Sequence, residues 1–185
     1  MMTKRLLAIL IILTAGAGGL EAQGRNAETL AGESWVTYRL VHPLHVIDAK
    51  STNVEYKIQL NPTKKEIEMV TAQVDVTTFD SGNSNRDSHA MEVIDALTYP
   101  DVEFTSTSIV QKGDSIFASG KLSFHGVTHD ITMAGTAQWQ ANRVDVHGAF
   151  DIGLTEFKID RPSLLMIPVE DKLSFVLQAA FTWRQ

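Results

Sequence analysis

The chain has no cysteine among its 185 residues, so neither a disulfide framework nor a thiolate metal site is available. It also lacks clustered Lys and Arg, and its formal net charge of -6 argues against nucleic acid or an anionic membrane surface as the main partner. A Gly-x-Ser-x-Gly motif, a glycine-rich phosphate-binding loop and a long internal repeat are all missing. Stability must therefore come from packing and sheet hydrogen bonds, in what is most simply one domain.

The first residues have the organisation of a secretory signal peptide. Lys4 and Arg5 precede the apolar run Leu6–Leu13, and small residues are frequent in Thr14–Ala22. Charged, apolar and cleavage regions follow one another in this order in signal peptides. A membrane-spanning helix needs roughly 20 apolar residues, far more than this run supplies. No cysteine follows the run, which excludes a bacterial lipoprotein anchor.

The N-terminal pattern divides the chain into three expected segments. Residues 1–22 are predicted to be a signal peptide cut before Gln23, residues 23–34 a flexible lead-in, and residues 35–185 the folded domain. Once the signal peptide is removed, we expect no stable insertion of the mature chain in a membrane. Export without cysteine suits a Gram-negative periplasm, which is where we expect the protein.

The remainder of the chain alternates apolar and polar residues with a period of two. Clear examples are Leu173–Trp183, Ile131–Gln140, Val54–Leu60 and Ile116–Phe124. This pattern is typical of antiparallel strands with one buried face. Turn signals such as Asn61-Pro62 separate the strands. We count about eight main strands, which can close into a barrel just wide enough for one ligand and free of exposed sheet edges.

One segment, Asp87–Leu97, interrupts the strand pattern. Met91 and Ile94 lie at helical spacing, and Asp87 or Ser88 is placed to cap the first helical turn. Tyr99-Pro100 would end the helix, because the residue before proline disfavours helical backbone. The sequence therefore predicts an all-β, antiparallel eight-stranded barrel with one short helix near residues 87–97, between the third and fourth strands.

Several different short motifs occur along the chain, and their order is more informative than any one of them. They are Tyr38–His42, Asp75-Val76, Arg86-Asp87-Ser88-His89, Tyr99-Pro100, Phe104–Thr107, Gly120-Lys121-Leu122, His125–Thr128 and Ile159-Asp160-Arg161. Together they resemble the YceI-like family of bacterial periplasmic proteins, described as binders of polyisoprenoids and related lipids in a lipocalin-like barrel. The resemblance covers most of residues 35–183. Departures fall at Pro43-Leu44-His45 and at Pro162–Leu165, and the family's extra opening strand has no clear counterpart before Trp35.

The polar motifs favour structural roles over chemistry. Asp87 would cap the helix, while Arg86 and His89 would hold it against the sheet through charge-assisted hydrogen bonds. His125-Gly126 suits a hairpin turn. Asp160-Arg161 is interpreted as a structural ion pair at a strand end.

The six histidines offer one alternative, a metal site. Strand ligands on one face need even spacing, so His42 and His45, three residues apart, would point to opposite faces. His125 and His129 flank a turn and are still candidate metal ligands. No ligand set with a distinctive spacing appears, so we expect no metal and no cofactor.

Inward-facing side chains of a small barrel either fill it or leave a cavity for one ligand. The resemblance implies that the parity shared by Val36 and His42 faces inward. The candidate ligand-contacting residues are Val36, Tyr38, Leu40, His42, Tyr56, Ile58, Phe104, Leu122, Phe124, Met133, Phe150, Leu173, Phe175 and Leu177. A solid core would use the same residues, and the resemblance favours the hollow barrel.

The expected function is a non-catalytic periplasmic carrier that sequesters a polyisoprenoid or similar long-chain apolar lipid. Nucleic acid is not expected as a partner, and a homodimer stays open. One alternative is a histidine-dependent metal-binding factor or hydrolytic enzyme that uses His125, His129 and Asp130. Another is a filled barrel that acts as a stress-related interaction module.

Overall fold

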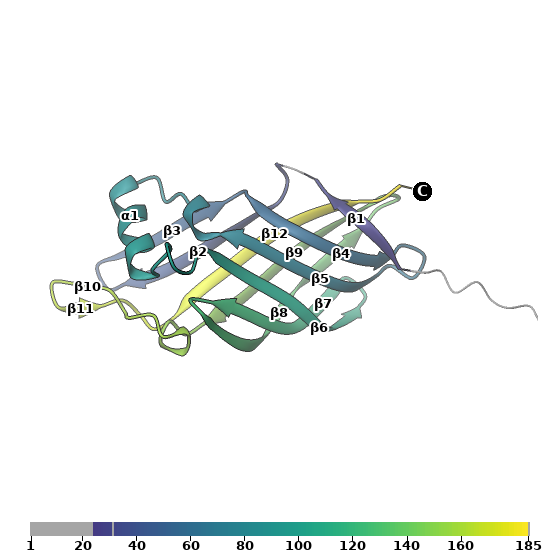
Figure 1. Ribbon diagram of the computed structural model, residues 1–185. Helices are drawn as coiled ribbons and strands as arrows, with labels where there is room; N and C mark the ends of the chain where they lie inside the picture. Colours follow the sequence, from purple (N-terminus) through teal and green to yellow (C-terminus); the bar gives the residue numbers. More distant parts are fainter. Residues whose placement is uncertain (1–23, 31, 185) are drawn as a thin grey trace, which may run out of the picture.

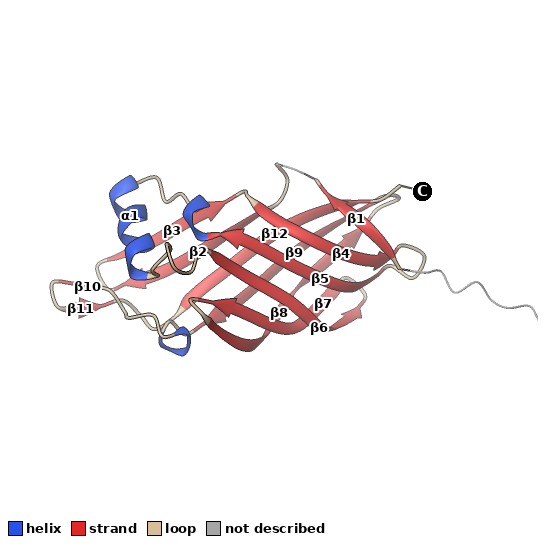
Figure 2. Cartoon of the chain, in the orientation of Figure 1, coloured by secondary structure: helices blue, strands red, loops and turns tan. Residues whose placement is uncertain are grey.

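Strands make up most of the computed structural model, which describes residues 24–30 and 32–184 (Figure 2). The strands are β1 (Arg25–Thr29), β2 (Trp35–His42), β3 (His45–Ser51), β4 (Val54–Asn61), β5 (Glu66–Asp75), β6 (Asp101–Lys112), β7 (Ser115–Phe124), β8 (Val127–Trp139), β9 (Arg143–Ile152), β10 (Ser163–Leu164), β11 (Ile167–Pro168) and β12 (Leu173–Thr182). The helical elements are η1 (Val76–Thr78), α1 (Ser84–Val93) and η2 (Thr155–Phe157). The signal peptide predicted for residues 1–22 lies outside the described residues.

Backbone hydrogen bonds close the sheet into a ring of eight antiparallel strands (Figure 1). The order is β1-β4-β5-β6-β7-β8-β9-β12, and β12 pairs with β1 to complete the ring. β2 also pairs with β12, beyond the end of β1, and β3 pairs with β2. Two of the eight barrel strands are therefore each divided into two segments. One consists of β1 and β2, and the other consists of β3 and β4. The predicted all-β, eight-stranded lipocalin-like barrel is confirmed.

β1 lies in the segment predicted to be a flexible lead-in. Its residues pair with both β4 and β12, so it completes the ring. After β1, the Leu30 N–H donates to the Ala180 carbonyl at 2.8 Å, and the buried Ser34 hydroxyl accepts from the Ala180 N–H at 3.2 Å. The strand was missed because Ala27 is its one apolar residue, which leaves no hydrophobic alternation to detect.

Helix α1 follows the third barrel strand, as predicted, but it starts at Ser84, before the expected boundary. Its cap is Asn83, whose side-chain oxygen accepts from the N–H groups of Asn85 and Arg86 at 3.1 and 3.2 Å. The expected cap at Asp87 or Ser88 is therefore wrong. The Asp87 carboxylate instead accepts from the Ser81 N–H at 3.2 Å and fixes the turn that enters the helix.

Among residues 24–30 and 32–184, no helix combines the length and the hydrophobicity needed to cross a membrane. α1 has ten residues, none of them fully buried, and covers one end of the barrel beside β2 and β3 (Figure 1). The residues that follow it form turns as far as Thr98, before β6 begins. The helix therefore ends earlier than Tyr99-Pro100 suggested.

The barrel interior contains two separate apolar clusters. One cluster packs side chains from β4, β5, β7, β8, β9 and β12 together with Trp183, and fills the barrel end at which β1 begins. Leu60, Ala137 and Val144 in this cluster have no exposed surface. The second cluster includes Val36, Leu122 and other residues of the opposite half, and α1 packs against it. The interior is thus filled by strand side chains at one end, whereas at the other end α1 also packs against the strands.

The cap assignment gives a direct stability test. Replacing Asn83 with Ala removes the acceptor for two helix N–H groups, so we expect the free energy of unfolding to fall by about 1 kcal/mol. Urea denaturation would measure the change. Asn85→Ala, within the same first turn, is the control, and we expect it to be neutral or slightly stabilising because alanine favours helix. Equal losses in the two variants would contradict the assignment.

Candidate ligand-binding site

The half of the barrel that α1 covers contains a cavity of about 190 Å³. Every barrel strand except β1 contributes to its wall. Of the fourteen residues predicted to contact a ligand, twelve border this cavity: Val36, Tyr38, Leu40, Tyr56, Phe104, Leu122, Phe124, Met133, Phe150, Leu173, Phe175 and Leu177. The cavity also reaches the exposed His89 on α1 and the half-buried Pro162, so it opens at this end of the barrel.

Strand register explains why these side chains converge. Tyr38 of β2 lies opposite Phe175 of β12, which in turn lies opposite Phe150 of β9. The rings of Phe150 and Phe175 stack with their centroids 4.8 Å apart. Because side chains alternate across a strand, the pairing carries alternate residues of each neighbouring strand into the cavity. The wall is therefore a continuous apolar surface drawn from distant parts of the sequence.

Tyr56 forms the floor of the cavity. Its ring meets Phe181 of the filled end edge to face, with centroids 5.4 Å apart. Burial raises the pKa of the Tyr56 phenol far above its ordinary value, so the side chain stays neutral. Ile58, two residues further along β4, belongs to the filled cluster below this floor. Ile58 therefore does not border the cavity, contrary to the prediction.

His42 is buried at the end of β2 and does not border the cavity, contrary to the prediction. Its Nδ1 accepts from the Leu44 N–H at 3.1 Å, so the proton of the neutral ring is on Nε2. Nε2 donates to the Ile167 carbonyl at 2.9 Å. His42 therefore ties the β2–β3 turn to the β10–β11 hairpin, a role that strand parity could not reveal.

Polar groups gather where α1 meets the cavity. Arg86 and Asp87 line it beside Tyr38, and the buried Nε–H of Arg86 has no hydrogen-bond partner among the described residues. Burial raises the pKa of the Tyr38 phenol, the Asp87 charge raises it further, and Arg86 lowers it. The exposed His89 lies 3.7 Å from Glu92 on its own helix. The expectation that Arg86 and His89 hold α1 against the sheet through hydrogen bonds is therefore wrong.

The other polar motifs make local structural contacts. His125 Nδ1 lies 3.0 Å from the Phe157 carbonyl, and His129 Nε2 lies 2.8 Å from the Glu156 carbonyl, so both rings contact η2. Asp130 pairs instead with Lys121 at 3.0 Å. The described part of the chain contains no group of three or more His, Cys, Asp or Glu residues arranged to hold a metal ion.

Arg161 bonds to the backbone, contrary to the ion pair expected with Asp160. Its guanidinium donates from Nε to the Val169 carbonyl at 2.8 Å, and Nη2 donates to the same oxygen. No ion pair joins Asp160 and Arg161 within residues 24–30 and 32–184. The contact holds the two ends of the β10–β11 segment together.

A family model described as a YceI-like domain matches residues 31–181. The chain belongs to the YceI-like family. A UPF0312 protein of Vibrio campbellii is 35% identical to it over 99 residues, which are 49% of this chain and 52% of that protein. The chain thus spans about half the length of the curated relatives it matches.

Solved structures share the YceI-like barrel. BcnA of Burkholderia cenocepacia superposes with a TM-score of 0.74 at 18% identity, covering 83% of this chain and 99% of that one. A polyisoprenoid binding domain from Saccharophagus degradans, implicated in plant cell wall breakdown, superposes with a TM-score of 0.65 at 11% identity, covering 88% and 100%. At these identities the likeness shows a common fold.

Several cavity residues of this YceI-like barrel were not foreseen from the sequence. On the strands, Val54 and Val102 have the parity of the predicted Tyr56 and Phe104, so alternation could have identified them. Val74 lies on β5, for which no ligand-contacting residue was predicted. The contribution of Met91 in α1 and of Ile94, the residue that caps the end of the helix, had no such signal. Helical spacing predicts that these two residues share a face, but not what the face covers.

The cavity wall predicts the effect of filling it. Leu122 is 3% exposed and faces the cavity, while the ring of Phe104 already occupies the space beside Gly120. We expect Leu122→Trp to reduce the uptake of a long-chain alcohol such as farnesol strongly, with little change in melting temperature, because the added ring enters existing space. Fluorescence displacement and thermal unfolding would measure both.

The matched control is Phe117→Trp on the same strand, since Phe117 is exposed on the outer face. It should bind farnesol as wild type does. If Leu122→Trp were to bind normally, or were destabilised by the roughly 1–3 kcal/mol typical of an overfilled core, the cavity would not be the ligand site.

Proposed function

We propose that this YceI-like protein is a non-catalytic carrier that sequesters a polyisoprenoid or similar long-chain apolar lipid inside its barrel. The observation that supports this most is the cavity itself, whose wall consists mainly of apolar side chains from β2 to β9 and from β12. Each methylene group moved from water into such a wall contributes roughly 0.8 kcal/mol. A chain of several isoprene units can therefore bind without a covalent bond.

The shape of the interior favours an extended ligand held by one end. The filled cluster behind Tyr56 closes the barrel on one side, and α1 borders the opening on the other. An apolar chain would enter past α1 and run towards Tyr56. A polar group on such a lipid would then lie near Tyr38 and Arg86, the polar side chains where α1 meets the cavity. The polyisoprenoid binding of the Saccharophagus degradans domain agrees with this proposal.

The carrier function is tested by what the protein retains from the cell. Protein purified without detergent should release a long-chain lipid on organic extraction, detected by mass spectrometry at close to one molecule per chain. Leu122→Trp should retain much less, and Phe117→Trp should retain the wild-type amount. A barrel from which no lipid is extracted, and which binds no added farnesol, would contradict the carrier function.

We also propose that the protein works in the periplasm after removal of residues 1–22. The motivation is the charged, apolar and small-residue order of that segment. Sequencing the N-terminus of protein released by osmotic shock should give a chain that starts near Gln23. Recovery of the full-length chain in the membrane fraction would contradict export by cleavage.

A further inference from the structure

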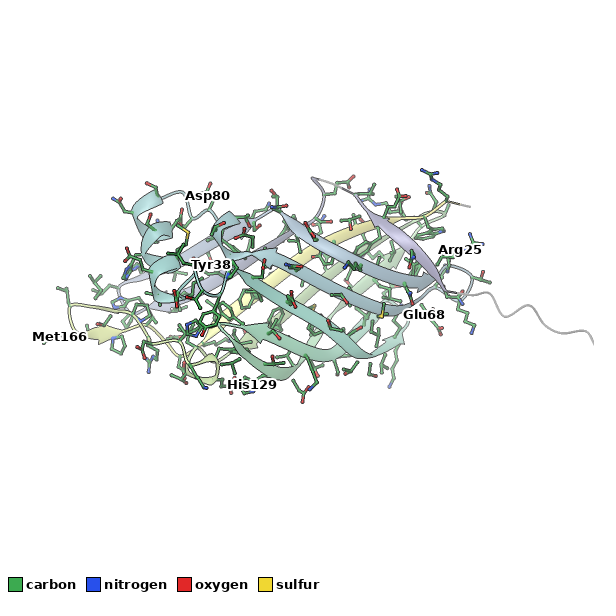
Figure 3. All side chains as sticks on the ribbon, viewed as in Figure 1. Arg25, Tyr38, Glu68, Asp80, His129 and Met166 are labelled. Atoms are coloured by element: carbon green, nitrogen blue, oxygen red, sulfur yellow. The ribbon has the colours of Figure 1, made fainter. Side chains whose placement is uncertain are left out.

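The hairpin of β10 and β11 presents large apolar side chains to solvent at the end of the barrel where the cavity opens. Leu165 and Met166 form its two-residue turn and are 77% and 88% exposed. Leu164 and Ile167, on either side of them, are also exposed, as is Leu44 in the β2–β3 turn. We call these five residues the apolar tip. In Figure 3, Met166 lies at the extreme end of the molecule.

The conformation of this turn is unfavourable for its own residues. Both Leu165 and Met166 have positive φ, 53° and 67°. Two-residue hairpin turns of this kind prefer Asn-Gly, because these residues tolerate left-handed backbone and branched or long side chains do not. Neither side chain recovers the loss by packing, since both are exposed. An unfavourable turn conformation that no contact within the protein offsets indicates that these side chains contact a partner outside the protein.

The apolar tip is held in place by the structure around it. His42 joins the β2–β3 turn to the Ile167 carbonyl at 2.9 Å, and the Glu170 N–H donates to the Val41 carbonyl at 2.8 Å. These two hydrogen bonds hold the β2–β3 turn and the β10–β11 hairpin together, so that they form one surface. Pro162, next to β10, borders the cavity, so the tip and the cavity mouth lie on the same segment.

Charge distribution indicates what the tip contacts. Residues 40–47 and 162–168 contain no Asp, Glu, Lys or Arg, although the chain carries a formal net charge of -6. A charge-free tip can enter an apolar medium without desolvating an ion. The net negative charge disfavours an anionic surface. The complementary partner is a lipid bilayer with a zwitterionic surface.

We propose that the apolar tip docks the barrel on a lipid bilayer, with the mouth of the cavity beside the membrane. The inference rests on the proposed carrier function, because it gives the lipid a route between bilayer and cavity that avoids water. Leu165 and Met166 enter the interfacial region, and the β2–β3 turn beside them adds Leu44. Docking is shallow and reversible, since a few apolar side chains give far less affinity than a spanning helix.

The decisive variant makes the turn more favourable while it removes the apolar groups. Leu165→Asn combined with Met166→Gly supplies the preferred turn residues, so the melting temperature should stay the same or rise. The amount of protein that co-sediments with phosphatidylcholine vesicles should fall by roughly tenfold or more. The control is Val110→Thr with Phe117→Thr, an exposed cross-strand pair on the outer wall, which should bind vesicles as wild type does.

A second readout uses the absence of cysteine. Met166→Cys and Phe117→Cys each introduce a single thiol that can carry an environment-sensitive fluorophore. On addition of phosphatidylcholine vesicles, the label at position 166 should shift to the blue and the label at position 117 should not. Equal shifts at the two positions, or none, would overturn the docking proposal.

Further outcomes separate docking from the alternatives. Vesicle binding that requires anionic lipid and disappears in salt would overturn the proposal, as would a dimer that dissociates when the tip is changed. Farnesol uptake tests the carrier function separately from docking. The variant that combines Leu165→Asn with Met166→Gly should still take up farnesol dispersed in detergent, because its cavity is unchanged. Loss of farnesol uptake in wild type with intact vesicle binding would refute the carrier and leave the docking surface standing.

Discussion

The hydrogen bonding of β12 on both of its edges is the constraint on which the rest of the structure depends. On one edge it pairs with β9 through ten residue pairs, and on the other with β2 and then β1. This pairing closes the sheet, which leaves the central strands with no free edge. It also decides which parity faces inward on every strand, because each neighbour inherits its register. The apolar wall of the cavity follows from that closure.

Closure alone does not make a cavity, because the same ring encloses a filled half and a hollow half. At the filled end, Phe181 and Trp183 together with branched aliphatic residues occupy the interior. At the other end, α1 covers the barrel in place of further inward packing, and its side chains complete the wall. Burial at one end stabilises the fold, and the space at the other end remains for a ligand. This division agrees with the proposed carrier function, because the filled end buries apolar side chains without a ligand.

Hydrogen bonds hold the elements around the opening in place. His42 links the β2–β3 turn to β11, Arg161 closes the β10–β11 segment on Val169, and Asp87 fixes the approach to α1. Such local hydrogen bonds hold exposed turns in a defined position without filling the cavity. The strained turn at Leu165 and Met166 lies within this arrangement. Conformational preference is given up there, next to the opening, as is common where a protein meets its ligand or partner.

The sequence by itself determined the fold class, the strand count, the presence of one helix after the third strand and most of the cavity wall. Period-two alternation reports which side chains share a face, so residues such as Leu122 and Phe175 could be identified from the sequence. For the strand of Tyr38, the resemblance to the YceI-like family implied which face points inward. The short strand β1 gave no such signal because it has a single apolar residue. Asn83 was overlooked as the cap because several neighbouring residues have side chains that can cap a helix.

Only the tertiary structure decided where along the barrel the interior is solid and where it is hollow. Ile58 has the inward parity of Tyr56, yet one packs in the filled cluster and the other forms the cavity floor. His42 has the parity of Tyr38, yet it bonds to a hairpin more than a hundred residues later. Alternation specifies a face of a strand but not a depth in the barrel. Depth depends on the register between strands and on what α1 and the loops cover, and those contacts exist only once the sheet has closed.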